Sequence, residues 1–422
     1  MSKFSSLRDR VLFYRERFGG NHYEHEAISE KPTGYAFSIV IPCFNEPDIL
    51  QTLNSLAGAN SPEQEILVVI VVNAPESAPE SVINQNNKSL RAIGNWQQTL
   101  CPDFITLKVI NAQNLPARKS GVGLARKIGM DAALYAMASN VTLPYLVTLD
   151  ADCTVSNNYL VKLEQVLKED HPDFATLYYE HNLSNLNEKE TEAIRFYELF
   201  LRYYGQALRF IGYPQSFHTI GSCMVVRAGL YATSGGMNTR KAGEDFYFLH
   251  KLARLGQHHP ITGTCVYPAA RISDRVPFGT GRALMNWQNG DRRYRNVYNW
   301  EAFEQLRLTR QQIDQRPIQA VEPAFWSEPV LHALQELGYL SYARQATAHA
   351  SHEEQLREKL LNFFTGFRVM QWFHYFRDQV FPDEPLLDSS IRLLNKIGND
   401  YPLLTLEECL QHYRNLDRNR VD

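Results

Sequence analysis

Two aspartates, Asp150 and Asp152, follow the apolar stretch YLVTL (145–149) and are separated by a single alanine. Where a chain leaves a buried strand, side chains at positions i and i+2 can both turn toward one point. Carboxylate oxygens at such a point suit Mg²⁺ or Mn²⁺, which keep coordination positions open for the phosphates of a substrate. The structural alternative is that both aspartates form a turn and cap a helix that begins near Ser156.

A second acidic pair, Glu244 and Asp245, stands at the start of a predicted helix in the segment GGMNTRKAGED. A carboxylate held there can accept the proton of an attacking hydroxyl group, and the glycines allow the backbone to approach a ligand closely. Acids in the first turn of a helix are also favoured by the helix dipole, so a purely structural role is the alternative.

Two further segments are rich in basic residues. The helix entrance within 114–133 carries Arg118, Lys119, Arg126 and Lys127 around glycines, so it could hold phosphates, or it could be a solvated helix face. The segment 270–295 contains six arginines, a Gly-Thr-Gly sequence and Trp287. We expect it to fold over an anionic substrate, with Arg275 and Arg282 as binding residues, unless its arginines are ordinary surface charges.

Alternating apolar runs and helical patterns must position these residues. Strands are predicted at 37–43, 65–72, 105–110, 145–149 and 219–229, and helices are predicted at 46–56, 121–138, 188–211 and 244–256. This order predicts an α/β fold with a mostly parallel sheet flanked by helices, in which ligands bind at the carboxyl ends of the strands. We divide the chain into an N-terminal extension (1–36), an α/β domain (37–300) and a helical C-terminal region (301–422).

Composition excludes several classes of protein. The 422 residues include 43 basic and 46 acidic side chains, a net charge of -3, so no overall basic field would recruit nucleic acid. The apolar runs are shorter than the roughly 20 residues that a membrane-spanning helix needs. Arginines interrupt the N-terminal segment, which predicts no signal peptide and a cytoplasmic protein. The six scattered cysteines form no CxxC pair and are predicted to be buried thiols.

Taken in order, the motifs resemble family 2 glycosyltransferases of the Rossmann-like GT-A fold, which transfer a sugar from a nucleotide-sugar donor to an acceptor. FSIVIPCFNEPDIL resembles the opening strand of that family, and GVGLARKIGMDAA resembles its helix start. LDAD resembles the DxD metal motif, and the segment from GSCMVV to AGED resembles the acceptor-side segment. The resemblance covers roughly residues 37 to 285.

The resemblance implies a role for each matching residue. Residues implied to contact the nucleoside or diphosphate are Pro42, Asn45, Glu46, Arg126 and Asp150. Asp152, with Asp150, would bind a divalent metal ion, Mn²⁺ or Mg²⁺. Asp245 would be the general base, and Glu244 would lie beside the acceptor, which could be a saccharide or a lipid-linked molecule.

Departures from the family pattern limit what the resemblance implies. Asn73 stands where the family has an acid that contacts the base, so the base preference is open. The histidine that many relatives use as a metal ligand has no counterpart, and Asp274 or water could take its place. His258 and His259 are expected on the surface. The Gln-x-x-Arg-Trp motif of processive members is not reproduced, which favours a non-processive enzyme.

Several alternatives stay open. The same fold hosts transferases that retain the anomeric configuration, and inversion is preferred here because Asp245 lies where a base is expected. A sugar nucleotidylyltransferase is a second alternative, although CFNEPDIL contains no glycine-rich phosphate loop. A non-catalytic nucleotide-sugar-binding protein is a third. The amphipathic segment 351–376 is predicted to form one helix, which could pack on the catalytic domain or contact a membrane peripherally.

Overall fold

The computed structural model describes residues 6–19, 34–139, 143–184, 186–271, 279–398 and 400–420. The chain forms two compact units. Unit 1 comprises Met1–Ile194, Thr219–Met285 and Arg414–Asp422, and unit 2 comprises Arg195–His218 and Asn286–Tyr413. Helices α6 (Glu188–Phe210), α9 (Thr280–Gln288) and α16 (Leu406–Arg418) contain residues of both units. The domain limits drawn from the sequence stay predictions.

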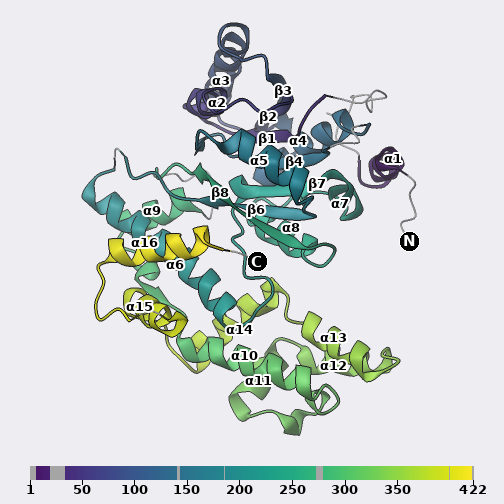
Figure 1. Ribbon diagram of the computed structural model, residues 1–422, viewed down its shortest axis with the longest axis vertical. Helices are drawn as coiled ribbons and strands as arrows, with labels where there is room; N and C mark the ends of the chain where they lie inside the picture. Colours follow the sequence, from purple (N-terminus) through teal and green to yellow (C-terminus); the bar gives the residue numbers. More distant parts are fainter. Residues whose placement is uncertain are drawn as a thin grey trace. The chain divides into compact units, whose positions relative to one another are not determined.

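Unit 1 is built on one sheet, which has eight strands in the described part of the chain (Figure 1). In spatial order the strands are β3 (Ile105–Leu115), β2 (Ile66–Pro75), β1 (Ser38–Cys43), β4 (Tyr145–Thr148), β7 (Met224–Arg227), β6 (Phe174–Tyr179), β8 (His258–Tyr267) and β5 (Thr154–Val155). Strands β3, β2, β1 and β4 are parallel to one another, and β7 is antiparallel to β4 and β6. The carboxyl ends of β1, β2 and β4 therefore meet at one edge.

Helices cover both faces of this sheet. The helices of unit 1 are α1 (Leu7–Phe18), α2 (Ile49–Ala57), α3 (Glu80–Thr99), α4 (Val122–Ala136), α5 (Tyr159–Glu169), α7 (Ala228–Thr233) and α8 (Glu244–Leu252). Residues of α2, α3 and α5 share a core with alternate residues of the strands, such as Ile39 and Ile70. Helix α4 packs on the other face, where a Cβ at Gly129 would lie 2.4 Å from Val40 Cγ1.

The first four predicted strands are confirmed, as are the helices predicted at 46–56 and 121–138 and the α/β fold class, whereas α3 was not predicted. The predicted strand at 219–229 is shorter than expected, because a 3₁₀ turn η1 (Gly221–Cys223) precedes β7 and α7 follows it. Pro42 occupies β1 without disrupting the sheet. The last β1–β4 pair is Val40 with Thr148, so the missing N–H of Pro42 lies beyond the point where β4 ends.

Unit 2 is helical apart from the short pair β9 (Asn296–Val297) and β10 (Glu384–Pro385). Its helices are α10 (Trp300–Gln315), α11 (Glu328–Glu336), α12 (Tyr339–Ala348), α13 (Glu353–Asn362), α14 (Gly366–Gln379) and α15 (Leu386–Ile397), with 3₁₀ turns η2 (Arg293–Arg295), η3 (Gln319–Val321) and η4 (Pro323–Phe325). The prediction of a single helix from residue 351 is wrong, because the structure has two helices there. α13 ends at Asn362, and α14 begins at Gly366 with Thr365 as its N-cap.

The aromatic residues of that segment are buried in the core of unit 2. Phe363, Phe364, Trp372 and Phe373 are at most 6% exposed. The Trp372 indole N–H donates to the Ala302 carbonyl oxygen at 3.0 Å, and the Phe373 ring lies 4.3 Å from that of Phe303. They therefore offer no surface for a membrane. No helix in the described ranges is long and apolar enough to span a membrane.

Candidate active site

The turn after β1 is tied to the end of β2 by Asn86 of α3. The Asn45 N–H donates to Asn86 Oδ1 at 2.9 Å, and Asn86 Nδ2 donates to the Asn73 carbonyl oxygen at 3.0 Å. Asn45 adopts a left-handed conformation (φ 49°), which asparagine tolerates better than most residues. The side-chain oxygen of Asn73 is buried and has no hydrogen-bond partner among the described residues. An unpaired buried acceptor at a strand end suits a ligand that supplies a donor.

Glu46 is the next residue of this turn, and its carboxylate is buried. The Ser89 hydroxyl donates to the Glu46 carbonyl oxygen at 2.7 Å, and the Asp48 N–H donates to Glu46 Oε1 at 2.9 Å. Glu46 is only 1% exposed, so its charge needs a compensating cation. The turn therefore holds a buried carboxylate in a fixed position at the sheet edge.

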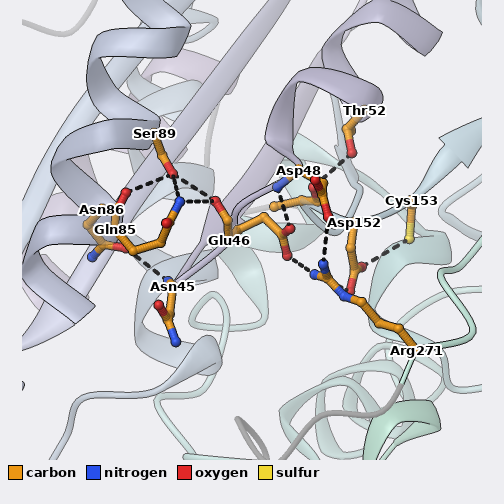
Figure 2. A network of polar contacts seen from close by, with 11 residues as sticks. Asn45, Glu46, Asp48, Thr52, Gln85, Asn86, Ser89, Asp152, Cys153 and Arg271 are labelled. Carbon is orange, nitrogen blue, oxygen red and sulfur yellow. Dashed lines mark hydrogen bonds and ion pairs between the residues drawn. The ribbon is translucent and has the colours of Figure 1, made fainter. Parts of the chain in front are cut away.

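Arg271, four residues after β8, supplies that cation (Figure 2). Its Nη2 is ion-paired with Glu46 Oε2 and lies 3.4 Å from Asp152 Oδ2, while its Nη1 lies 3.2 Å from Asp48 Oδ2. Burial acts to lower the pKa of Arg271, but its hydrogen bond to Glu46 and the neighbouring acids raise that pKa overall. Arg271 is one of the six arginines in the predicted binding segment 270–295, but the sequence does not single it out, because it is 119 positions from Asp152.

Arg126 of α4 joins the two acidic pairs that the sequence singled out. Its Nη2 is ion-paired with Asp150 Oδ1, and its Nη1 is ion-paired with Glu244 Oε1. Burial acts to lower the pKa of Arg126, but the charges of Asp150 and Glu244 outweigh this effect and raise it. Arg126 therefore stays charged and fixes the end of β4 against the start of α8.

Gly221 makes room for this arginine. A Cβ at Gly221 would lie 2.3 Å from Arg126 Nη2, closer than any side chain tolerates. The Gly221 carbonyl oxygen accepts a hydrogen bond from Thr148 Oγ1 of β4 at 2.6 Å, which holds η1 against the strand end. The glycine is thus required by the close approach of the guanidinium group.

Asp245 follows Glu244 in the first turn of α8. Its Oδ1 accepts a hydrogen bond from the Phe246 N–H at 2.7 Å. Burial and the charge of Glu244 raise the pKa of Asp245 to about 7, although Arg126 acts in the opposite direction. A carboxylate with a pKa near neutrality is well matched to accept a proton at physiological pH.

The other predicted phosphate-binding residues of α4 are placed elsewhere. Lys127 Nζ is buried and contacts Asp131 Oδ2 at 2.7 Å and the Tyr14 hydroxyl at 2.6 Å. A Cβ at Gly123 would lie 2.3 Å from the Arg240 carbonyl oxygen, so the helix entrance packs against the segment that leads to α8. Arg118 and Lys119 are exposed. Of the four basic residues, Arg126 alone binds the acids of this site.

The interpretation of Asp150 and Asp152 as helix caps is wrong. Helix α5 begins at Tyr159 with Asn158 at its N-cap, and both aspartates instead bind arginines. Their side chains are 34% and 26% exposed, so a solute can reach them. Within the described residues, no three His, Cys, Asp or Glu side chains are arranged to hold a metal ion by themselves.

The structure describes only some of the remaining residues that the sequence analysis named. Arg282 lies in α9, whereas Asp274 and Arg275 lie outside the described residues, together with the rest of 272–278. His258 and His259 begin β8 and are half-buried, and His258 Nε2 lies 2.8 Å from Thr176 Oγ1. Five of the six cysteines are buried, all six are free thiols, and Cys101 is half-buried.

Residues 116–234 match a protein family described as Glycosyl transferase family 2. This segment contains Arg126, Asp150 and Asp152, so the family resemblance is confirmed for the part of the chain that carries these residues, whereas Glu46, Glu244 and Asp245 lie outside the matched segment. Over this segment the chain is similar to family 2 glycosyltransferases. A comparison with curated proteins finds no match.

The chain is also similar to solved structures, two of which contain bound ligands. One is TarS 1-349 of S. aureus in complex with UDP-GlcNAc, with a TM-score of 0.42 and 15% identity, covering 78% of this chain and 90% of that one. Another is GalNAc-T7 with UDP, GalNAc and Mn²⁺, with a TM-score of 0.37 and 13% identity, covering 89% of this chain and 59% of that one.

Proposed function

We propose that this chain transfers a hexosyl group from a nucleoside diphosphate sugar to an acceptor hydroxyl, with inversion at the anomeric carbon. The observation that carries the proposal is the pairing of Arg126 with both Asp150 and Glu244. It brings the acids at the end of β4, suited to a diphosphate and its cation, next to Asp245, suited to accept a proton.

The nucleoside is proposed to bind at the ends of β1 and β2. Asn73 offers a buried carboxamide with an unpaired oxygen, and its NH₂ group supplies donors beside that acceptor. A nucleobase that presents a donor next to an acceptor complements this pattern. Uracil has such an edge, which makes UDP the first probe of donor binding.

The diphosphate is proposed to bind with a divalent cation held by Asp150 and Asp152. The acids around the site, Glu46, Asp48, Asp150, Asp152, Glu244 and Asp245, outnumber the guanidinium groups of Arg126 and Arg271. An anionic diphosphate would be repelled from this site without an added cation. Mg²⁺ and Mn²⁺ fit here, because they bind through one or two carboxylates and complete their coordination with phosphate oxygens. When bound, the ion would neutralise the leaving diphosphate.

The chemical step follows from the position of Asp245. Its carboxylate takes the acceptor hydroxyl proton, and the oxygen forms a bond to the anomeric carbon as the bond to the diphosphate oxygen breaks. The Phe246 N–H fixes Asp245 Oδ1, which leaves Oδ2 to accept the proton. Attack from the face opposite the leaving group inverts the anomeric configuration.

The acceptor is proposed to be a saccharide or a lipid-linked molecule, and transfer is proposed to be non-processive. The cytoplasmic location inferred from the sequence stays a prediction.

A panel of nucleotide sugars tests the proposal. The purified protein should release free nucleotide from at least one donor when Mn²⁺ and a mixture of acceptor sugars are present, and much less when the metal is chelated. Release of pyrophosphate from a nucleoside triphosphate would instead identify a nucleotidylyltransferase. Tight UDP binding with no turnover of any donor would favour a non-catalytic binding protein.

A further inference from the structure

The guanidinium group of Arg271 lies at the place where the proposed metal ion would act. Its Nη2 is ion-paired with Glu46 and lies 3.4 Å from Asp152 Oδ2. Figure 2 shows the Arg271 side chain directed at Glu46, Asp48 and Asp152 together. The guanidinium group of Arg271 therefore already contacts Asp152, a carboxylate that the proposed function assigns to a divalent ion.

Both cations cannot be bound to Asp152 at once in this arrangement. A divalent ion would lie about 2.1 Å from a carboxylate oxygen, within a few ångström of the Arg271 guanidinium group. At such separations two positive charges repel strongly in a partly buried site, unless an anion lies between them. In the protein without nucleotide, the two cations must therefore compete.

The contacts of Arg271 with Glu46 and Asp152 differ in strength, and the weaker contact is the one that a divalent ion can replace. Its partner Glu46 is 1% exposed and depends on a nearby cation, whereas the Asp152 side chain is 26% exposed and can be solvated. The contact with Asp152, at 3.4 Å, is also long for a charge-assisted hydrogen bond. Arg271 can thus release Asp152 while it stays paired with Glu46.

We propose that Arg271 is the resident cation of the diphosphate site and competes with the divalent ion for Asp152. This inference rests on the metal site of the proposed function, and adds that the free protein binds the metal weakly. A diphosphate supplies the negative charge that allows both cations to stay, so metal and nucleotide bind together. Arg271 is a positioning residue in this account.

The proposal predicts two opposite changes when the charge of Arg271 is removed. In Arg271→Gln, Asp152 and Glu46 lose a competing cation, so Mn²⁺ alone should bind about tenfold more tightly or better. The same variant has a more negative site, so UDP alone should bind about tenfold more weakly. A general loss of structure would weaken both.

The test is a calorimetric titration of the full chain with MnCl₂ alone, with UDP alone and with MnCl₂ in the presence of UDP. Arg271→Lys keeps the charge and should bind Mn²⁺ like the wild type. Arg254→Gln, which removes one exposed positive charge from the same unit, is the matched control and should change neither affinity. Thermal unfolding establishes that each variant is folded.

Unchanged or weaker Mn²⁺ binding by Arg271→Gln would overturn the proposal. So would a wild-type protein that binds Mn²⁺ as tightly without UDP as with it, a result that does not depend on whether any variant folds. These binding measurements involve no sugar transfer. Opposite changes in the two affinities with no turnover of any donor would sustain the role of Arg271 and refute the proposed enzyme activity.

Discussion

Asp150, at the end of β4, and Glu244, at the start of α8, are bound by the same guanidinium group, that of Arg126. The two acids are far apart in the sequence, and α4 carries the arginine that joins them. A donor held at the strand ends is therefore brought next to Asp245, the residue that follows Glu244.

Gly221→Ala should disturb the site by displacing Arg126. The added methyl group would overlap Arg126 Nη2, and misplacing a site by about 1 Å can cost on the order of 100-fold in rate. We expect turnover to fall by about tenfold to hundredfold, measured as nucleotide release from a donor that the wild type uses. Gly94→Ala is the control, because nothing lies within 4 Å of the added Cβ, and it should retain wild-type turnover.

The rate should depend on pH through Asp245. Its pKa is raised to about 7, and only the ionised carboxylate can accept a proton, so kcat/KM should rise with pH and level off above about pH 8. Glu244→Gln removes a charge that raises this pKa. The rising limb should therefore move to lower pH in that variant. A limb that stays in place would show that another group titrates.

Asp152→Ala should remove the metal dependence of nucleotide binding. UDP affinity should increase when Mn²⁺ is added to the wild type and should be insensitive to Mn²⁺ in the variant, as judged by calorimetry. Since the Asp152 side chain is 26% exposed, the variant should stay folded. An undiminished effect of Mn²⁺ on the variant would place the metal elsewhere.

Tyr14→Phe should destabilise unit 1. The Tyr14 hydroxyl donates to Asp131 Oδ1 at 2.8 Å and accepts from Lys127 Nζ, and burial raises the pKa of Asp131. Loss of these buried hydrogen bonds should lower the free energy of unfolding by about 1–2 kcal/mol, measured by urea denaturation. Leu12→Ala, at a position that is 46% exposed on the same helix, should cost much less.

The sequence predicted those features that depend on local pattern. Asp150 and Asp152 were expected at a strand end because the residues before them are continuously apolar, and the structure places them there. β6 and β8 were not predicted. β8 begins with His-His-Pro and contains Gly263, so its sequence lacks the apolar run that marked the other strands.

Contacts between residues far apart in the sequence could not be predicted from local sequence patterns. No spacing rule connects Arg271 with Glu46 or Tyr14 with Asp131, because the fold alone brings these residues together. The docking of α1 was missed for the same reason. The arginine-rich segment 270–295 was the local signal for Arg271, and it does not distinguish Arg271 from the other five arginines.

The central claim is that Asp245 is the base of an inverting sugar transfer, and Asp245→Asn tests it most directly. The variant keeps the size of the side chain and its acceptor for the Phe246 N–H, but it cannot take up the acceptor proton. The measurement is the rate of nucleotide release from a donor that the wild type consumes, made alongside UDP affinity in the presence of Mn²⁺. We predict a rate lower by roughly 100-fold or more with UDP affinity little changed. Transfer at near the wild-type rate would contradict the claim and favour a mechanism that retains the anomeric configuration.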